Sequence, residues 1–406
     1  MENILDSIKN YKNRDYFYIL SLNIIGNCAI WIQNMMSSII ASNISTTSMM
    51  NSIYQAAITI PFFCAFIAGY IGDLYNKKLI VSFSNFLLFL CSIVISFIDF
   101  KNENDIFILI ILVGLFSIGS VLRMTVTQSL ITTVVDTSFL KKASLLNNLG
   151  FNISRVIGLA SAGYLMSYFS IRNLYMILSI LFLFTSLIMF KIKINDSSLD
   201  GNRNRNRSKS KGLIHLTTHS SLFKIYSIDV FIMFFNGSLI WALLPYIAKS
   251  QFGFSSEGQS DLMAILGSGS LSTLFFYSVA SKIKVGSSYY FIISLLLPLS
   301  MLIISITENI YFIYISLFVF GLVWNLKVSL LNGEVQFISP KESITRVISL
   351  FFMVMYSGQF IGVLFYGVIN DVYGINTSFM ISGCALFIGI LLVIFKFKCE
   401  RQMEYL

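Results

Sequence analysis

The sequence predicts an all-α membrane protein with twelve transmembrane helices in two pseudo-repeated six-helix bundles. Three observations carry this prediction: an apolar composition, twelve apolar runs of membrane-spanning length, and an internal repeat. Of the 406 residues, 56% are hydrophobic and 12% are charged, whereas about a quarter of the residues of a soluble domain are charged. This composition excludes a water-soluble protein and a disordered one.

The apolar runs define the expected helices. A helix needs ~20 mostly apolar residues to cross the hydrocarbon core of a bilayer. Such runs lie at 17–41, 49–72, 79–99, 105–127, 146–168, 173–192, 225–247, 259–281, 288–306, 309–332, 347–370 and 377–397. The polar residues before the first run contain no signal for cleavage, so we expect the first helix to remain in the protein.

The distribution of basic residues predicts the orientation of these helices. With the N-terminus inside, 22 of the 28 Lys and Arg residues fall in cytoplasmic segments, and only Lys101, Arg172 and Lys249 fall in external loops. Basic residues are enriched on the cytoplasmic side of membrane proteins. We therefore expect both termini in the cytoplasm.

The only long polar stretch divides the chain into three parts. We expect an N-terminal bundle at 1–192, a cytoplasmic basic linker at 193–224 and a C-terminal bundle at 225–406. The basic run in the linker could bind nucleic acid or anionic lipid, but no aromatic or folded platform accompanies it, which favours a flexible linker. His215 and His219 lack a third ligand, so neither a metal nor a cofactor is expected.

Glycines at matching positions indicate an internal repeat. Gly158 and Gly362 differ by 204 positions, as do Gly163 and Gly367. These four residues are interpreted as a helix-packing motif that recurs in the fifth and eleventh helices. Paired small residues are common at helix contacts, so chance is the alternative explanation.

The loop after the second helix carries the most specific motif. Gly69, Asp73, Lys77 and Lys78 match the Gly-x-x-x-Asp-Arg-x-Gly-Arg-Lys loop of the major facilitator superfamily, which this sequence resembles. Asn76 replaces the second glycine of the motif, and asparagine is the residue next best at adopting a left-handed turn. The resemblance implies two bundles that alternate around a central substrate site, with this loop taking part in the conformational change.

Two further resemblances concern direction and branch. The stretch from Gly158 to Gly163 is similar to the antiporter signature Gly-Pro-x-x-Gly-Gly, without its proline. Segments 154–158, 241–245 and 362–374 resemble the bacterial enterobactin-exporter-like and macrolide-efflux-like permeases. This implies a bacterial inner-membrane exporter, which we expect to be a monomer.

Four charged residues lie within the expected spans: Arg123, Arg155, Asp229 and Lys327. A charge at mid-bilayer costs roughly 2.5–3.5 kcal/mol on insertion scales, so each needs a reason to be there. The resemblance places spans four, seven and ten around the central cavity. We expect Asp229 to pair with Lys327 or Arg123 in one conformation and to take up a proton in another. The alternative is that the long side chains reach the inner interface instead.

These charges and the absence of other motifs narrow the function. No phosphate-binding loop or nucleophile motif occurs, so neither ATP use nor an enzyme is expected. The surplus of cations favours an anionic substrate, with Tyr164, Asn236, Trp324, Asn325 and Gln359 as candidate pocket residues. The leading hypothesis is proton-coupled export of a small organic molecule, either a siderophore-like anion or a drug. The alternatives are import of a nutrient or iron chelate, and a transport-inactive sensor or scaffold in the bilayer.

Overall fold

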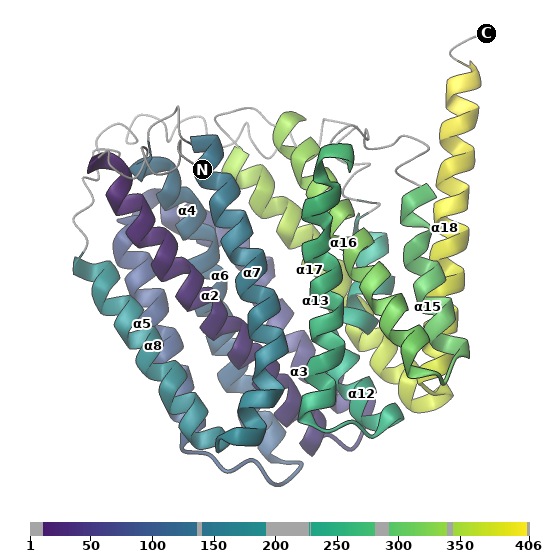
Figure 1. The fold of residues 1–406 in the computed structure, drawn as a ribbon, viewed down its shortest axis with the longest axis horizontal. Coiled ribbons are helices and arrows are strands. Elements are labelled where there is room, and N and C mark those ends of the chain that lie inside the picture. Colours follow the sequence, from purple (N-terminus) through teal and green to yellow (C-terminus); the bar gives the residue numbers. More distant parts are fainter. Residues whose placement is uncertain are drawn as a thin grey trace.

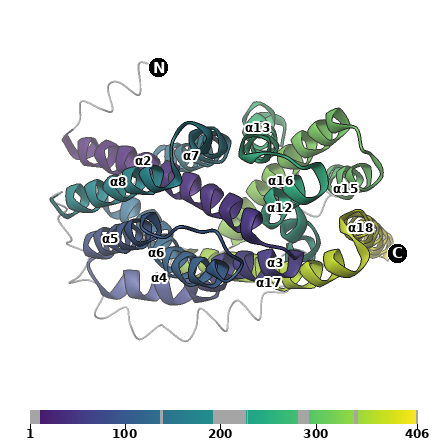
Figure 2. The same cartoon turned by 90° about the horizontal axis from the view of Figure 1, so that it is seen from below.

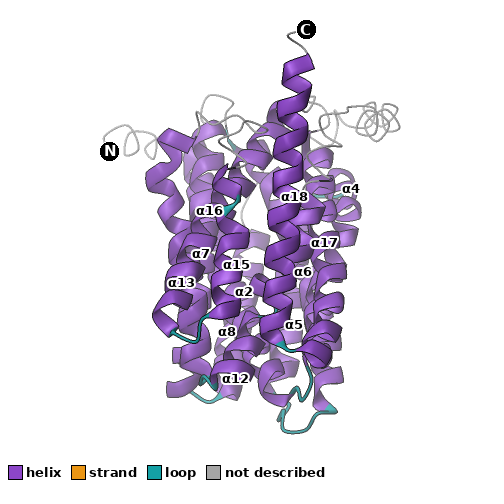
Figure 3. Ribbon diagram, turned by 90° about the vertical axis from the view of Figure 1, so that its right-hand side faces the viewer, coloured by secondary structure: helices purple, strands orange, loops and turns teal. Residues whose placement is uncertain are grey.

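A computed structural model of the protein describes residues 11–135, 140–191, 227, 229–280, 292–338 and 344–403. Across these residues the chain is helical and contains no strand (Figure 3). The predicted fold class, an all-α membrane protein, is confirmed. The predicted linker at 193–224, with His215 and His219, lies outside the described residues.

The first six predicted spans coincide with eight helical elements, which we call the first half. These are α2 (Tyr11–Ile44), α3 (Ser48–Thr59), η1 (Ile60–Cys64), α4 (Ala65–Leu74), α5 (Lys77–Ser96), α6 (Asp105–Val134), α7 (Leu140–Tyr168) and α8 (Ile171–Lys191). The second span is divided because Pro61 lies at the start of the 3₁₀ segment η1, where proline lacks the N–H that a continuous α-helix requires.

The later predicted spans coincide with a second set of elements, which we call the second half. These are η3 (Met233–Ala242), α12 (Leu244–Phe252), α13 (Ser256–Ala280), α15 (Leu296–Ile306), α16 (Ile310–Ile338), α17 (Ile344–Tyr373) and α18 (Ile375–Met403). Among the described residues, seven helices are individually long and apolar enough to cross a membrane. The other spans are shorter, more polar or divided into segments.

The two halves lie side by side (Figure 2). Their boundary is formed by α7 against α13 and by α3 against α17. The start of α2 and the end of α18 lie on one face of the molecule (Figure 1). The opposite face, here called the distal face, carries the short connections at 45–47, 169–170, 253–255 and 307–309.

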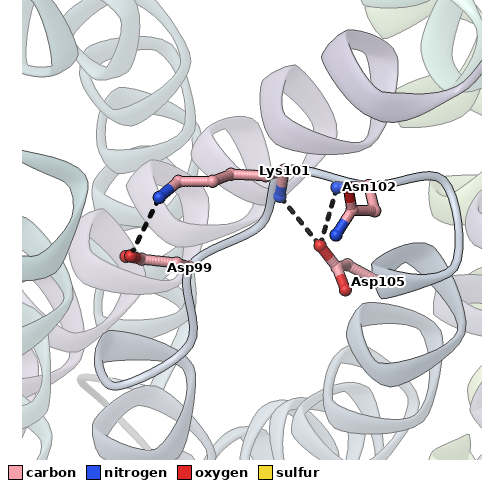
Figure 4. Close-up of polar contacts among 4 residues, drawn as sticks. All are labelled: Asp99, Lys101, Asn102 and Asp105. Carbon is pink, nitrogen blue, oxygen red and sulfur yellow. Dashed lines mark hydrogen bonds and ion pairs between the residues drawn. The ribbon is translucent and has the colours of Figure 1, made fainter.

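The connection between α5 and α6 is held by polar contacts at the start of α6. The Asp105 carboxylate accepts hydrogen bonds at 2.8 Å from the backbone N–H groups of Lys101 and Asn102, and the Lys101 ammonium lies 3.4 Å from Asp99 (Figure 4). The ion pair is exposed and contributes little to stability. The carboxylate fixes the loop where it enters α6.

The motif loop takes a different form from the one its sequence predicts. Gly69 and Asp73 belong to the last turns of α4, and Lys77 and Lys78 begin α5. The expected left-handed turn at Asn76 is wrong, because its φ is −59°. Its side chain instead accepts hydrogen bonds from the N–H groups of residues 78 and 79 and caps α5, a role that asparagine fills well.

Candidate substrate and proton site

A buried ion pair joins the seventh span to the tenth. The Lys327 ammonium on α16 lies 2.8 Å from Oδ1 of Asp229, which precedes η3 by one helical turn. The side chains are 1% and 0% exposed, respectively. Of the two partners expected for Asp229, Lys327 and Arg123, it is Lys327 that forms the ion pair. The alternative in which Lys327 extends to the inner interface does not hold in this structure.

Only one of the two carboxylate oxygens of Asp229 has a partner within the described residues. Its second oxygen, Oδ2, is buried and has no hydrogen-bond partner within the described residues. A buried polar atom without a partner costs roughly 1–3 kcal/mol, and more when the group is charged. This oxygen is therefore a place where a proton or a donor group of a ligand would be stabilised.

The helix that follows Asp229 is a π-helix. Residues 233–242 of η3 have the wider hydrogen-bonding pattern, which is rare and frequently marks functional sites. Asn236, at the centre of η3, is fully buried, and neither its amide nitrogen nor its oxygen has a partner within the described residues. The sequence analysis named Asn236 but gave no signal for the π-helix.

Two tryptophans connect the ion pair to the first half. The Lys327 ammonium lies 4.5 Å from the centre of the Trp324 ring, and the Trp324 and Trp241 rings are 6.5 Å apart. Trp241 in turn faces Arg155 of α7, whose guanidinium carbon lies 5.2 Å from the ring centre. Cation–π contacts of this kind hold a cation on an aromatic face. Three of the four predicted charged residues therefore lie in one continuous network across the boundary.

Arg155 is the charge in this network for which the described part of the chain supplies no counter-ion. Its guanidinium donates to the Asn152 side chain at 3.1 Å, and its Nε has no partner among the described residues. Trp241 Nε1 is likewise a buried donor for which these residues supply no acceptor. No carboxylate of the described residues lies within 4 Å of Arg155, so none of them compensates the positive charge beside Trp241.

Arg123, the fourth predicted residue, lies apart from Asp229 and packs against α2. Its guanidinium donates to the Asn27 side chain at 2.6 Å and to the backbone carbonyl of Asn23 at 3.3 Å. A side chain at Gly26 would overlap the guanidinium, so the glycine makes room for it. Arg123 is 3% exposed, and it therefore does not extend to the inner interface in this structure.

Two of the four packing glycines, Gly163 and Gly367, lie where the two halves meet on the distal side. A Cβ atom at Gly163 of α7 would overlap the backbone carbonyl of Ser256 on α13, and one at Gly367 of α17 would overlap Ser52 of α3. Ser52 and Ser256 also differ by 204 positions, so the repeat extends to the partners of both glycines. Gly158 instead brings α7 against Trp31 of α2, and Gly362 is buried in α17.

Polar contacts reinforce the same boundary. The Gly163 N–H donates to Ser260 Oγ at 2.7 Å, and the Tyr164 hydroxyl donates to Asp261 at 2.6 Å. The Tyr164 hydroxyl is thus engaged on the distal side, and its place in the substrate pocket stays a prediction. The contact draws α7 and α13 together.

Two charged side chains of the second half clamp the turn between α2 and α3. The Asp371 carboxylate accepts from the N–H groups of Ser48 and Met49 at 2.7 and 3.0 Å, at the positive N-terminal end of α3. The Lys249 ammonium donates to the carbonyls of Ser42 and Asn43 at 2.9 Å, at the negative C-terminal end of α2. We call these four contacts the α2–α3 clamp. The sequence gives no cue for it, since both residues appear as ordinary loop charges.

In the motif loop, the Lys78 ammonium lies 5.7 Å from the centre of the Phe190 ring of α8. Gly72 allows α4 to approach Val126 of α6. The side chain of Asp73 lies outside what the structure describes. The role of this loop in conformational change stays a prediction.

The comparisons with solved structures agree on the fold. A bacterial homologue of the human lysosomal transporter Spinster, solved in an inward-facing and occupied conformation, has a TM-score of 0.71 at 12% identity, over 97% of each chain. The xylose transporter XylE from E. coli has a TM-score of 0.69 at 11% identity, over 93% of this chain and 95% of its own. The human organic anion transporter MFSD10 has a TM-score of 0.65 at 12% identity, over 95% of this chain and 100% of its own. Similarity at these identities shows the fold.

No curated protein sequence matches the chain significantly. The family model of the transmembrane secretion effectors, a branch of the major facilitator superfamily, matches residues 10–404. That match covers nearly the whole length of the chain, including both halves and every residue of the charged network. The chain therefore belongs to the transmembrane secretion effectors of the major facilitator superfamily and is a multi-pass membrane transporter.

Proposed function

We propose that the protein exports a small organic molecule with an anionic group in exchange for protons. The proposed setting is a bacterial inner membrane, with both termini in the cytoplasm and the distal face outside. The observation that carries the proposal is the buried pair of Asp229 and Lys327, in which one carboxylate oxygen has no partner within the described residues. The secretion-effector description of the family supports the outward direction.

The free oxygen of Asp229 supplies a means of coupling. A hydroxyl or amide donor of the substrate that binds Oδ2 gains a charge-assisted hydrogen bond, worth about 1.5–3 kcal/mol. A proton on the same oxygen removes both the charge and the acceptor. Substrate and proton therefore exclude one another at this atom, as exchange requires. Asn236 on the same helix adds a donor and an acceptor.

Arg155 and Trp241 supply the selectivity for an anionic group. The guanidinium has no counter-ion within the described residues, whereas Lys327 is already neutralised by Asp229. An acidic group of the substrate would thus bind Arg155, and its apolar body would lie against the two tryptophans. A siderophore-like anion meets this description better than a macrolide-like drug, which carries no acid.

The direction also fits the electrical gradient. Export of a monoanion and import of a proton both move positive charge inward, so each contributes about 2.3 kcal/mol per 100 mV of inside-negative potential. We take the contacts on the distal side, from Gly163 and the α2–α3 clamp, to close the outer side of the pathway. Rocking of the bundles 1–192 and 225–406 about the charged network would open it.

Inside-out membrane vesicles with an acidic lumen test the proposal. A pH-sensitive dye reports protons that leave the lumen when 2,3-dihydroxybenzoate, citrate or erythromycin is added outside. We expect at least one of the acids to discharge the pH gradient in vesicles that contain the protein, and not in vesicles that lack it. Substrate-dependent proton uptake by right-side-out vesicles alone would instead establish import and overturn the proposal.

Replacing Arg155 with glutamine tests the anion selectivity. We expect Arg155→Gln to raise the concentration of acid needed for half-maximal discharge at least about tenfold, because a hydrogen-bonded charge pair is worth about 1.5–3 kcal/mol. Arg172→Gln is the matched control, since Arg172 lies at the distal end of α8 against Phe97 and outside the network. If Arg155→Gln and the unmodified protein need the same concentration of acid for half-maximal discharge, Arg155 does not bind the substrate.

A further inference from the structure

Arg123 is a buried cation without a counter-ion among the residues that the structure describes. It lies on α6 against α2 in the first half and is 3% exposed. No carboxylate lies within 4 Å of it among the described residues, and its recorded partners are the neutral oxygens of Asn23 and Asn27. An arginine side chain stays protonated in proteins. Its positive charge is therefore buried without compensation, which is strongly unfavourable unless a negative charge joins it.

The unpartnered polar atoms around this charge can all donate a hydrogen bond. Within the described residues, Arg123 Nε, Asn23 Nδ2 and Thr127 Oγ1 are buried and lack partners. Asn23 is bound to the guanidinium through its oxygens, and Thr127 follows Arg123 by one turn of α6. Asn23 and Thr127 are 5% and 6% exposed. A ligand for this cluster must accept hydrogen bonds and carry negative charge.

We propose that Arg123, Asn23 and Thr127 bind a small monovalent anion inside the first half. The ligand is an acceptor-only ion with the size of a halide or a carboxylate group. Water satisfies donors but does not neutralise the guanidinium, which is why an anion fits better. The site is separate from the Asp229 network, so the inference stands whatever substrate the protein carries and in whichever direction.

The test uses the purified full-length protein in detergent at constant ionic strength. The thermal unfolding midpoint is measured while a bulky buffer sulfonate is replaced by chloride, bromide or acetate. We expect a saturable rise in the midpoint, because an ion that binds only the folded protein stabilises it. A response to halides alone identifies an inorganic anion, and a response to acetate as well identifies a site for carboxylate groups; either response supports the site.

Substitutions locate the effect. We expect Arg123→Gln to abolish the anion response, and Thr127→Val to raise the apparent Kd roughly tenfold or more while leaving the arginine in place. Arg172→Gln removes one positive charge at the distal end of α8 and should respond like the unmodified protein. If Arg123→Gln does not fold, Thr127→Val carries the test. A midpoint that does not depend on the anion, or an unchanged response in Thr127→Val, would overturn the proposal.

Discussion

Replacing Asp229 with asparagine is expected to abolish the discharge of the pH gradient that the acids cause in inside-out vesicles. Asparagine has nearly the same shape but carries no charge, so neither a proton nor a substrate donor meets a carboxylate at this position. The change also leaves the Lys327 ammonium buried without its counter-ion. Breaking a buried pair by removing one partner costs about 3–5 kcal/mol, so the thermal unfolding midpoint should also fall.

A double substitution separates transport from stability. Replacing both partners by Asp229→Asn and Lys327→Met removes the unpaired charge, so we expect much of the lost stability to return. Transport should stay absent in the double variant because the coupling carboxylate is still missing. If the acids discharge the pH gradient in vesicles with Asp229→Asn as fast as in vesicles with the unmodified protein, another group couples the proton.

Replacing Gly163 with alanine is expected to open the distal side. The added methyl group would overlap the backbone carbonyl of Ser256, which has no rotamer by which to move aside. Relief requires α7 and α13 to separate, and overpacking of this kind costs about 1–3 kcal/mol. The Gly163 N–H would also lose its 2.7 Å bond to Ser260. The closed conformation should thus lose roughly one to two orders of magnitude in population.

Spin labels on cysteines placed at Ser167 and Ser255 would measure this separation, since both positions are exposed near the distal ends of their helices. The distance distribution should shift to longer values in Gly163→Ala. Gly114→Ala is the control, because a Cβ atom there meets only the Ala57 carbonyl at 4.0 Å. Its distances should match those of the unmodified protein. Matching distributions in Gly163→Ala would show that this contact does not hold the halves together.

Much of the fold could be predicted from the sequence because bilayer physics is strict. A segment in the hydrocarbon core must be apolar and helical, so long apolar runs identify the spans. The same strictness made the four embedded charges conspicuous and led to the expectation that Asp229 pairs with Lys327 or Arg123. The structure contains the pair with Lys327.

Other features depend on tertiary geometry that leaves no local pattern. The π-helix of η3 has the composition of an ordinary apolar helix, and Trp241 gained its role only from its neighbours Arg155 and Trp324. Asp371 and Lys249 are short-range partners of backbone groups more than two hundred residues away. Asn76 was expected in a left-handed turn because asparagine suits both that turn and a helix cap.

The α2–α3 clamp gives the protein a built-in reporter of its own conformation. The N–H groups of Ser48 and Met49 are at the start of α3, where no preceding turn of the helix accepts their bonds, and the structure satisfies them with Asp371 of the other half. Their exchange with deuterated solvent should therefore be slow only while the halves are together on this side. Deuterium uptake by these two amides, followed in a peptide covering residues 44–52, would report the fraction of open molecules without an attached probe.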